Sequence, residues 1–116
     1  TEILASGDVA GATSDRFVWR WIDRIVAAGT TEQHEIYEPL GEIDTAPQHA
    51  EFLTAWRAGR AAYDEGRFET ALSAFRAAAS LRPDDGPSRV FVDRCAAFLE
   101  KGTPIGWDGT WHFDHK

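Results

Sequence analysis

The chain has 116 residues and a formal net charge of −7, enough sequence for one small domain or for parts of two. No apolar run approaches the roughly 20 residues that a membrane-spanning helix needs, so we expect no direct membrane contact. Lysine occurs only at Lys101 and Lys116 and the arginines are scattered among acids. A nucleic-acid surface needs clustered cations, so we expect no nucleic-acid partner.

The N-terminal part of the chain has the pattern of a β-hairpin. Residues 2–5 favour a short strand, and Ser6 can cap a weak helix over 7–13. Aromatic and β-branched residues alternate over 16–26, which predicts a strand with Phe17, Trp19 and Trp21 on one face. Gly29 lies in the turn that follows, and a second alternation over 32–38 completes the hairpin.

The rest of the chain reads as three helices and a tail. Residues 39–47 hold two prolines and one glycine and predict a linker. Apolar residues at helical spacing predict helices over 48–65, 68–81 and 88–101, the last capped by Ser88. Residues 102–116 are expected to be extended, with Trp107 and Trp111 packed on the third helix. The predicted fold class is therefore α+β, mostly α.

The stretch from Gly59 to Pro83 resembles one tetratricopeptide repeat, a helix–turn–helix unit of about 34 residues. The signature positions are occupied by Gly59, Gly66, Ala71, Phe75, Ala78 and Pro83. Only one repeat and one further helix are present, whereas such repeats need stacked neighbours to bury their faces. A partner surface must therefore come from the hairpin, the tail or another chain.

Residues 1–41 resemble the last strands of a catalytic domain of the bacterial class III adenylate/guanylate cyclases. The matching segments are Ile3-Leu4-Ala5-Ser6, Asp15-Arg16-Phe17, Asp23-Arg24-Ile25, Gly29 and Glu35-Ile36-Tyr37-Glu38-Pro39-Leu40. The whole chain is also similar to the C-terminal ends of some such cyclases, which carry a short helical segment and then Arg-Cys and Trp-Asp-Gly. Here these are Arg94-Cys95 and Trp107-Asp108-Gly109.

The resemblance implies a parent enzyme that forms cyclic AMP from ATP with Mg²⁺ or Mn²⁺, at sites completed by two chains. It places the catalytic residues upstream, so no catalytic residue, metal site or cofactor is expected in this chain. In the family, the hairpin loop often carries a lysine that reaches the nucleotide phosphates. Here that loop is Ala28, Gly29 and Thr30, and Ala28 stands at the lysine position.

Other polar residues are interpreted as ordinary surface or packing residues. His112 and His115 are odd-spaced in an extended tail and would point to opposite faces, which disfavours a metal site. Glu32, Glu35 and Glu38 are expected on a solvated hairpin face. The single Cys95 excludes an internal disulfide and suits a reducing compartment, so we expect a cytoplasmic location, with the parent anchored to a membrane at most through an N-terminal region.

We therefore expect the C-terminal region of a cyclase: catalytic-domain strands over 1–41, a linker over 42–47, a repeat-like helical segment over 48–101 and a tail over 102–116. The expected partners are a second copy of the chain or the rest of its own cyclase domain. One alternative is a tetratricopeptide-type interaction module without enzymatic activity. Another is a degenerate cyclase that only binds or pairs.

Overall fold

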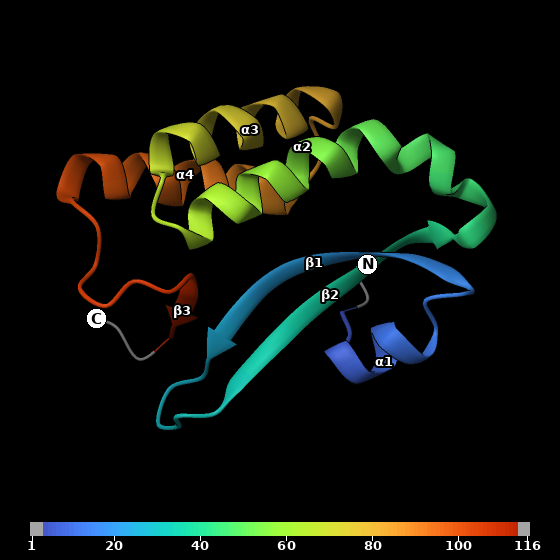
Figure 1. Cartoon of the computed structure of the whole chain (residues 1–116), viewed down its shortest axis with the longest axis horizontal. Coiled ribbons are helices and arrows are strands. Elements are labelled where there is room, and N and C mark those ends of the chain that lie inside the picture. Colours follow the sequence, from blue (N-terminus) through green and yellow to red (C-terminus); the bar gives the residue numbers. More distant parts are fainter. Residues whose placement is uncertain (1–3, 114–116) are drawn as a thin grey trace. The chain divides into compact units, whose positions relative to one another are not determined.

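The computed structural model of the protein describes residues 4–113. The elements are, in order, α1 (Gly7–Ala12), β1 (Phe17–Val26), β2 (Gln33–Glu42), the short 3₁₀ helix η1 (Ile43–Thr45), α2 (Ala46–Asp64), α3 (Phe68–Leu81), α4 (Gly86–Lys101) and β3 (Thr110–His112). Figure 1 shows the small sheet and the helices that follow it in the chain. The predicted α+β class is confirmed. No helix within the described range is both long and apolar enough to cross a membrane.

The chain forms two compact units. The sheet unit holds the described residues up to His49 and those from Thr110 on, and the helical unit is Ala50–Gly109. The helical unit is therefore an insertion in the sequence between strands of one sheet. The boundaries proposed from the sequence for cyclase and repeat segments stay predictions.

The sheet has the strand order β2-β1-β3. β1 and β2 form the predicted antiparallel hairpin, and β3 pairs with β1 in parallel, with Arg24 opposite Thr110 and Val26 opposite His112. Figure 1 shows β3, the last strand of the chain, beside the end of β1. Ala5 adds a single antiparallel bridge to Tyr37 on the other side of β2. The remainder of the strand expected over 2–5 lies largely outside the described residues.

The buried positions of β1 shift by one residue at a β-bulge. Val18 and Arg20 are buried, then the register shifts between Trp21 and Asp23, and the next buried residue on this face is Asp23 instead of Ile22. A bulge adds one residue to a strand and so moves the following side chains to the other face. The strict alternation expected over 16–26 therefore holds only for its first half.

The irregular conformation expected for the linker over 39–47 is wrong, because these residues are largely in regular elements. β2 continues to Glu42, η1 follows, and α2 starts at Ala46. Pro39 is tolerated because β2 lies at the edge of the described sheet and the register with β1 shifts beside it, between Val18 and Trp19. Proline is disfavoured only in central, regularly paired strands, so Pro39 did not indicate the end of β2.

The helical unit has an aromatic core. Trp56 of α2 packs edge-on against Phe75 of α3 and Phe91 of α4, with ring centroids 5.1 and 5.3 Å away. Tyr63 joins the same cluster 4.9 Å from Phe91. All four side chains are at most 1% exposed, so this cluster holds the three helices together.

The helix ends follow local rules, with one correction. Ser6 caps α1 as predicted, accepting a hydrogen bond from the Val9 amide at 3.4 Å. The cap of α4, however, is Asp85 and not Ser88, so that prediction is wrong. The Asp85 carboxylate accepts from the Ser88 amide at 3.0 Å, and Pro87 occupies the first turn, where its missing N–H costs no hydrogen bond.

Candidate functional site

The hairpin loop that follows β1 is the candidate phosphate-contacting segment. Gly29 has φ of 79°, and Thr30 closes the turn by donating from its amide to the Ala27 carbonyl at 3.2 Å. The Thr30 hydroxyl also donates to that carbonyl, at 3.1 Å. Ala28 is exposed and brings no charge. Side chains of the loop from Ala27 to Thr31 therefore offer no cation to a phosphate group.

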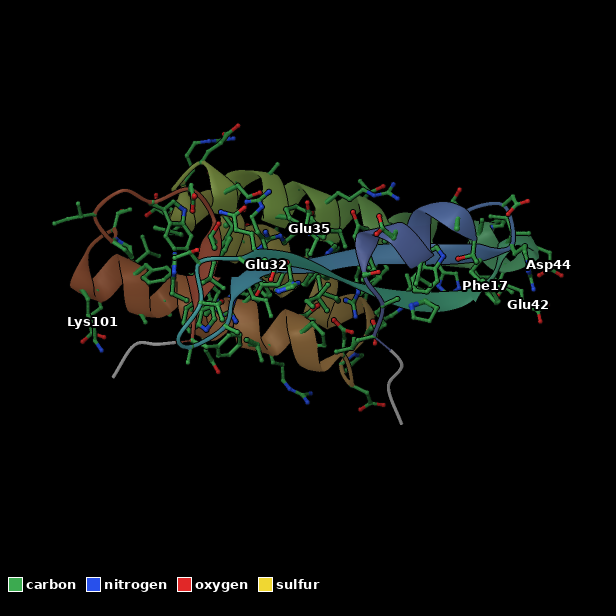
Figure 2. All side chains as sticks on the ribbon, turned by 90° about the horizontal axis from the view of Figure 1, so that it is seen from below. Phe17, Glu32, Glu35, Glu42, Asp44 and Lys101 are labelled. Atoms are coloured by element: carbon green, nitrogen blue, oxygen red, sulfur yellow. The ribbon has the colours of Figure 1, made fainter. Side chains whose placement is uncertain are left out.

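The carboxylates of the hairpin do not form one cluster. Glu38 is paired with Arg20, which is only 1% exposed. Glu32 and Glu35 are exposed and lie towards the turn end of the hairpin, whereas Phe17, Glu42 and Asp44 lie at the opposite end (Figure 2). The expectation of a wholly solvated glutamate face is thus wrong for Glu38, because the buried Arg20 guanidinium needs a partner.

The C-terminal strand reaches the base of this loop. Thr110 is 3% exposed and pairs with Arg24 of β1. Val26, the last residue of β1 before the loop, lies opposite His112 and accepts a hydrogen bond from the Phe113 amide at 3.0 Å. The tail therefore fixes the residue from which the loop departs. Trp111 lies in β3 opposite Ile25.

Just before β3, Trp107 anchors the tail within the helical unit. Its indole Nε1 donates to the Tyr63 carbonyl in the last turn of α2, at 2.7 Å. Its ring packs against Tyr63, Phe68 and Phe98, with centroids 5.1 to 5.4 Å away. The predicted packing of Trp107 on the third helix is confirmed through Phe98 of α4. The Tyr63 carbonyl also accepts from the Gly66 amide at 3.0 Å, so the indole adds a second hydrogen bond to it.

Gly109, which lies between Trp107 and β3 in the sequence, allows a close approach of its backbone to Asp64 at the end of α2. A Cβ atom at Gly109 would lie 2.1 Å from the Asp64 Oδ1 and 3.1 Å from the Asp64 Cα. Gly109 also has φ of 89°, a left-handed conformation that side chains disfavour. Two residues of this segment therefore contact the end of α2: Trp107 through its hydrogen bond to Tyr63, and Gly109 through its close approach to Asp64.

The residues assigned to the repeat signature occupy structural positions. Ala71, Phe75 and Ala78 are 0% exposed on α3. Gly59 faces Phe75, and Gly66, with φ of 79°, forms the turn between α2 and α3. Pro83 follows the end of α3. Membership of the tetratricopeptide family stays a prediction.

A buried cation lies inside the helical unit and was missed from the sequence. Arg60 is 2% exposed, pairs with Asp64 at 2.9 Å, and lies 4.9 and 5.0 Å from the ring centroids of Tyr63 and Phe91. The four-residue spacing of Arg60 and Asp64 was the available signal, but it is common on exposed helices. Burial of such a pair became apparent only in the packed unit.

Cys95 lies beside this cation but is chemically quiet. Burial raises the pKa of its thiol to about 11, although the charges of Arg60 and Arg94 act in the opposite direction. The thiolate is the reactive form, so at neutral pH this thiol is neither a nucleophile nor a ready metal ligand.

The described residues contain no group of three or more His, Cys, Asp or Glu side chains arranged to hold a metal ion. His112 is exposed at the end of β3. Asp114 and His115, with which it was considered as a ligand set, lie outside the described residues.

Comparison with known proteins adds one similarity. No family model and no solved structure matches the chain. Over 90 residues, 76% of its length, the chain is 30% identical to an adenylate cyclase of Dictyostelium discoideum named as terminal-differentiation specific. The match spans 4% of that protein's length. The chain is therefore similar to a short part of an adenylate cyclase.

Proposed function

We propose that this chain is the C-terminal structural and regulatory region of an adenylate or guanylate cyclase. The observation that carries the proposal is the 90-residue similarity to an adenylate cyclase, which extends over most of this chain. The pairing of β3 with β1 supports the proposal, because the residues of the helical unit then lie, in sequence, between strands of the same sheet.

In this proposal the parent enzyme forms cyclic AMP from ATP, using Mg²⁺ or Mn²⁺ held by residues upstream of this chain. The metal ions would stabilise the charge that develops on the phosphate groups. This chain performs no bond-making step. It contributes the hairpin that completes the catalytic sheet, and it supports contacts within the chain or between two copies.

The test is a cyclase assay on three proteins: the full parent, the parent truncated after Glu42, and this chain alone. Each is assayed with ATP and GTP in Mg²⁺ and Mn²⁺. We expect an active parent, a silent isolated chain and a truncated parent with clearly reduced activity, since the truncation removes β3 from the base of the loop.

Cyclase activity in the isolated chain, or full activity in the truncated parent, would contradict the proposal. A silent but folded and dimeric parent would instead favour a degenerate cyclase. In that case an Ala28→Lys variant of the parent tests whether the missing loop cation is the cause.

A second candidate function is a tetratricopeptide-type interaction module, and the compact helical unit with its own aromatic core favours it. This candidate predicts that the intact chain binds a peptide or helix of a partner protein. It also predicts that the isolated chain folds independently as a monomer and that the full protein has no cyclase activity, which separates the two proposals in the same assay.

A further inference from the structure

We propose that the outer edge of β2, at Gln33 and Glu35, binds an extended basic segment of a partner protein. The segment adds a strand beside β2 and places a lysine or arginine side chain in the hollow next to this edge. All residues of this site belong to the sheet unit, and the binding does not require cyclase activity.

The backbone groups on this edge of β2 face away from β1. Tyr37 bonds to Ala5 through both its N–H and its C=O, each at 2.8 Å, so these groups point outward. Backbone directions in a strand repeat every second residue, so those of Glu35 and Gln33 point outward as well. Among the described residues, only Ala5 bridges β2 on this side, because the chain then enters α1 at Gly7. The edge from Glu35 towards the hairpin turn can therefore accept another strand.

This edge alone offers a partner few hydrogen bonds. β2 begins at Gln33, and Tyr37 is already bonded to Ala5, which leaves the outward groups of Gln33 and Glu35. So short a strand pairing is marginal in water. A partner segment therefore also needs a side-chain contact beside the edge.

The hollow beside the edge can supply that contact. It has a volume of about 510 Å³, and its lining includes the apolar residues Leu4 and Ile25 and the acidic residues Asp8 and Glu35. Lysine and arginine pack their apolar stems on such surface while their charged ends remain near water and acids. The composition of the hollow therefore favours a basic side chain.

The two carboxylates of the hollow form no salt bridge with another described residue. The cation opposite Glu35 on β1 is Arg24, and its guanidinium lies 5.2 Å from the centroid of the Trp21 ring. A cation from a partner segment would thus be the first to pair with Asp8 or Glu35 in this part of the chain.

The side chain of Glu35 lies on the same face of β2 as the hollow. Side chains two residues apart in a strand share a face, so Glu35 and Tyr37 do so. The Tyr37 ring lies at the start of α1, since a Cβ atom at Gly7 would be 3.6 Å from its Cε1. Burial raises the pKa of the Tyr37 hydroxyl, and the negative charge of Glu35 raises it further. Both observations indicate that Glu35 lies beside the hollow.

Strand addition would bring the basic side chain to this face. Residues directly opposite each other in paired strands have their side chains on one face, with Cβ atoms about 4.5–5.5 Å apart. A lysine or arginine opposite Glu35 would therefore lie beside the carboxylate and could reach the hollow.

Charge distinguishes this partner from a second copy of the chain. Residues 33–42 of β2 contain no lysine or arginine, so a second copy pairing through β2 would bring another Glu35 to the acidic hollow. Opposite charges across paired strands stabilise them, and like charges destabilise them. A basic segment should therefore displace a second copy from this edge.

The test measures binding of a fluorescently labelled synthetic peptide to the intact chain by fluorescence anisotropy. The peptide alternates threonine and valine around one central lysine, a composition that favours an extended strand. A control peptide has norleucine in place of the lysine, which keeps the apolar stem and removes the charge. We expect the lysine peptide to bind roughly two- to tenfold more tightly than the control, the effect of one or two exposed ion pairs.

Protein variants separate the side-chain contact from the strand pairing. Glu35→Gln and Asp8→Asn should each weaken binding of the lysine peptide by about two- to fivefold, because each removes one charge from the hollow. Glu42→Gln is the matched control, since Glu42 is exposed in the same strand at the opposite end of the hairpin (Figure 2), and it should leave binding unchanged. Glu35→Pro removes the outward N–H and should abolish binding of both peptides. Circular dichroism checks that each variant remains folded.

Three results would overturn the proposal: no binding of the lysine peptide, equal affinity for the two peptides, or unchanged binding by a folded Glu35→Pro variant. Sedimentation velocity with excess lysine peptide identifies the occupant of the edge. We expect a monomer with bound peptide, whereas a dimer that persists would show that a second copy occupies the edge and would also overturn the proposal. These measurements succeed or fail separately from the cyclase assay.

Discussion

At the residue scale, Gly59 determines how closely α2 can approach α3. A Cβ atom there would lie 2.6 to 2.9 Å from three ring atoms of Phe75, which is 0% exposed. Gly59→Ala should therefore lower the free energy of unfolding by about 1–2 kcal/mol, because overpacking outweighs the helix-propensity gain. Urea titration followed by circular dichroism measures the change.

Gly11→Ala is the matched control, since a Cβ atom at Gly11 of α1 meets nothing within 4 Å. Its stability should be unchanged or rise by up to about 1 kcal/mol, the propensity difference between glycine and alanine. If the Gly59→Ala variant were as stable as the unmodified chain, the α2–α3 contact would be able to accommodate the added methyl group without loss of stability.

Local residue roles were the part of the molecule best predicted from the sequence. Gly66 was expected at the turn between two helices, and Trp107 was expected to pack on the third helix; both are observed. Each prediction depended on a property of one residue. Arg60 was missed because its burial depends on Phe91 of α4, a residue far from it in the sequence.

At the element scale, the N-terminal cap of α4 is a pair of hydrogen bonds from Asp85 to the buried Ser88. Asp85 accepts hydrogen bonds from both the amide and the hydroxyl of Ser88, at 3.0 and 2.6 Å, and Ser88 is 0% exposed. Asp85→Ala should lower the free energy of unfolding by about 1–2 kcal/mol, since it removes the cap from a buried position. Urea denaturation again measures it.

Asp84→Ala removes the same charge one residue earlier from an exposed side chain, and its effect should stay within about 0.5 kcal/mol. Equal losses for the two variants would show that net charge near the helix start, and not the specific cap, stabilises α4.

Elements with long periodic patterns were predicted well, and short or irregular ones were not. The helix over 68–81 is observed with those bounds, because its apolar spacing is unambiguous. The extension of β2 through Pro39 to Glu42 was missed, because a propensity rule took no account of the edge position. β3 has only three residues, and its pairing with β1 is set by contacts far apart in sequence.

At the scale of the whole molecule, the outer edge of β2 makes a dimer the expected state of the isolated chain. Both the N–H and the C=O of Tyr37 bond to Ala5, each at 2.8 Å, so they point away from β1. Strand backbone groups repeat this direction every second residue, so those of Glu35 point to the same edge. Beside this edge, residues 4–8 and 33–37 border a hollow of about 510 Å³. Exposed strand edges pair with other strands, and a second copy of this chain supplies one.

We therefore predict that sedimentation velocity of the isolated chain shows a concentration-dependent monomer–dimer equilibrium. Glu35→Pro should shift it to monomer, because proline removes the outward-pointing N–H while the neighbouring residues keep their bonds to β1. Glu35→Ala loses the same carboxylate but keeps that N–H, so it should dimerise at least as well as the unmodified chain. A monomer at every concentration would rule out edge pairing in the isolated chain. Equal dimerisation of the proline and alanine variants would show that the dimer contact lies away from the outer edge of β2.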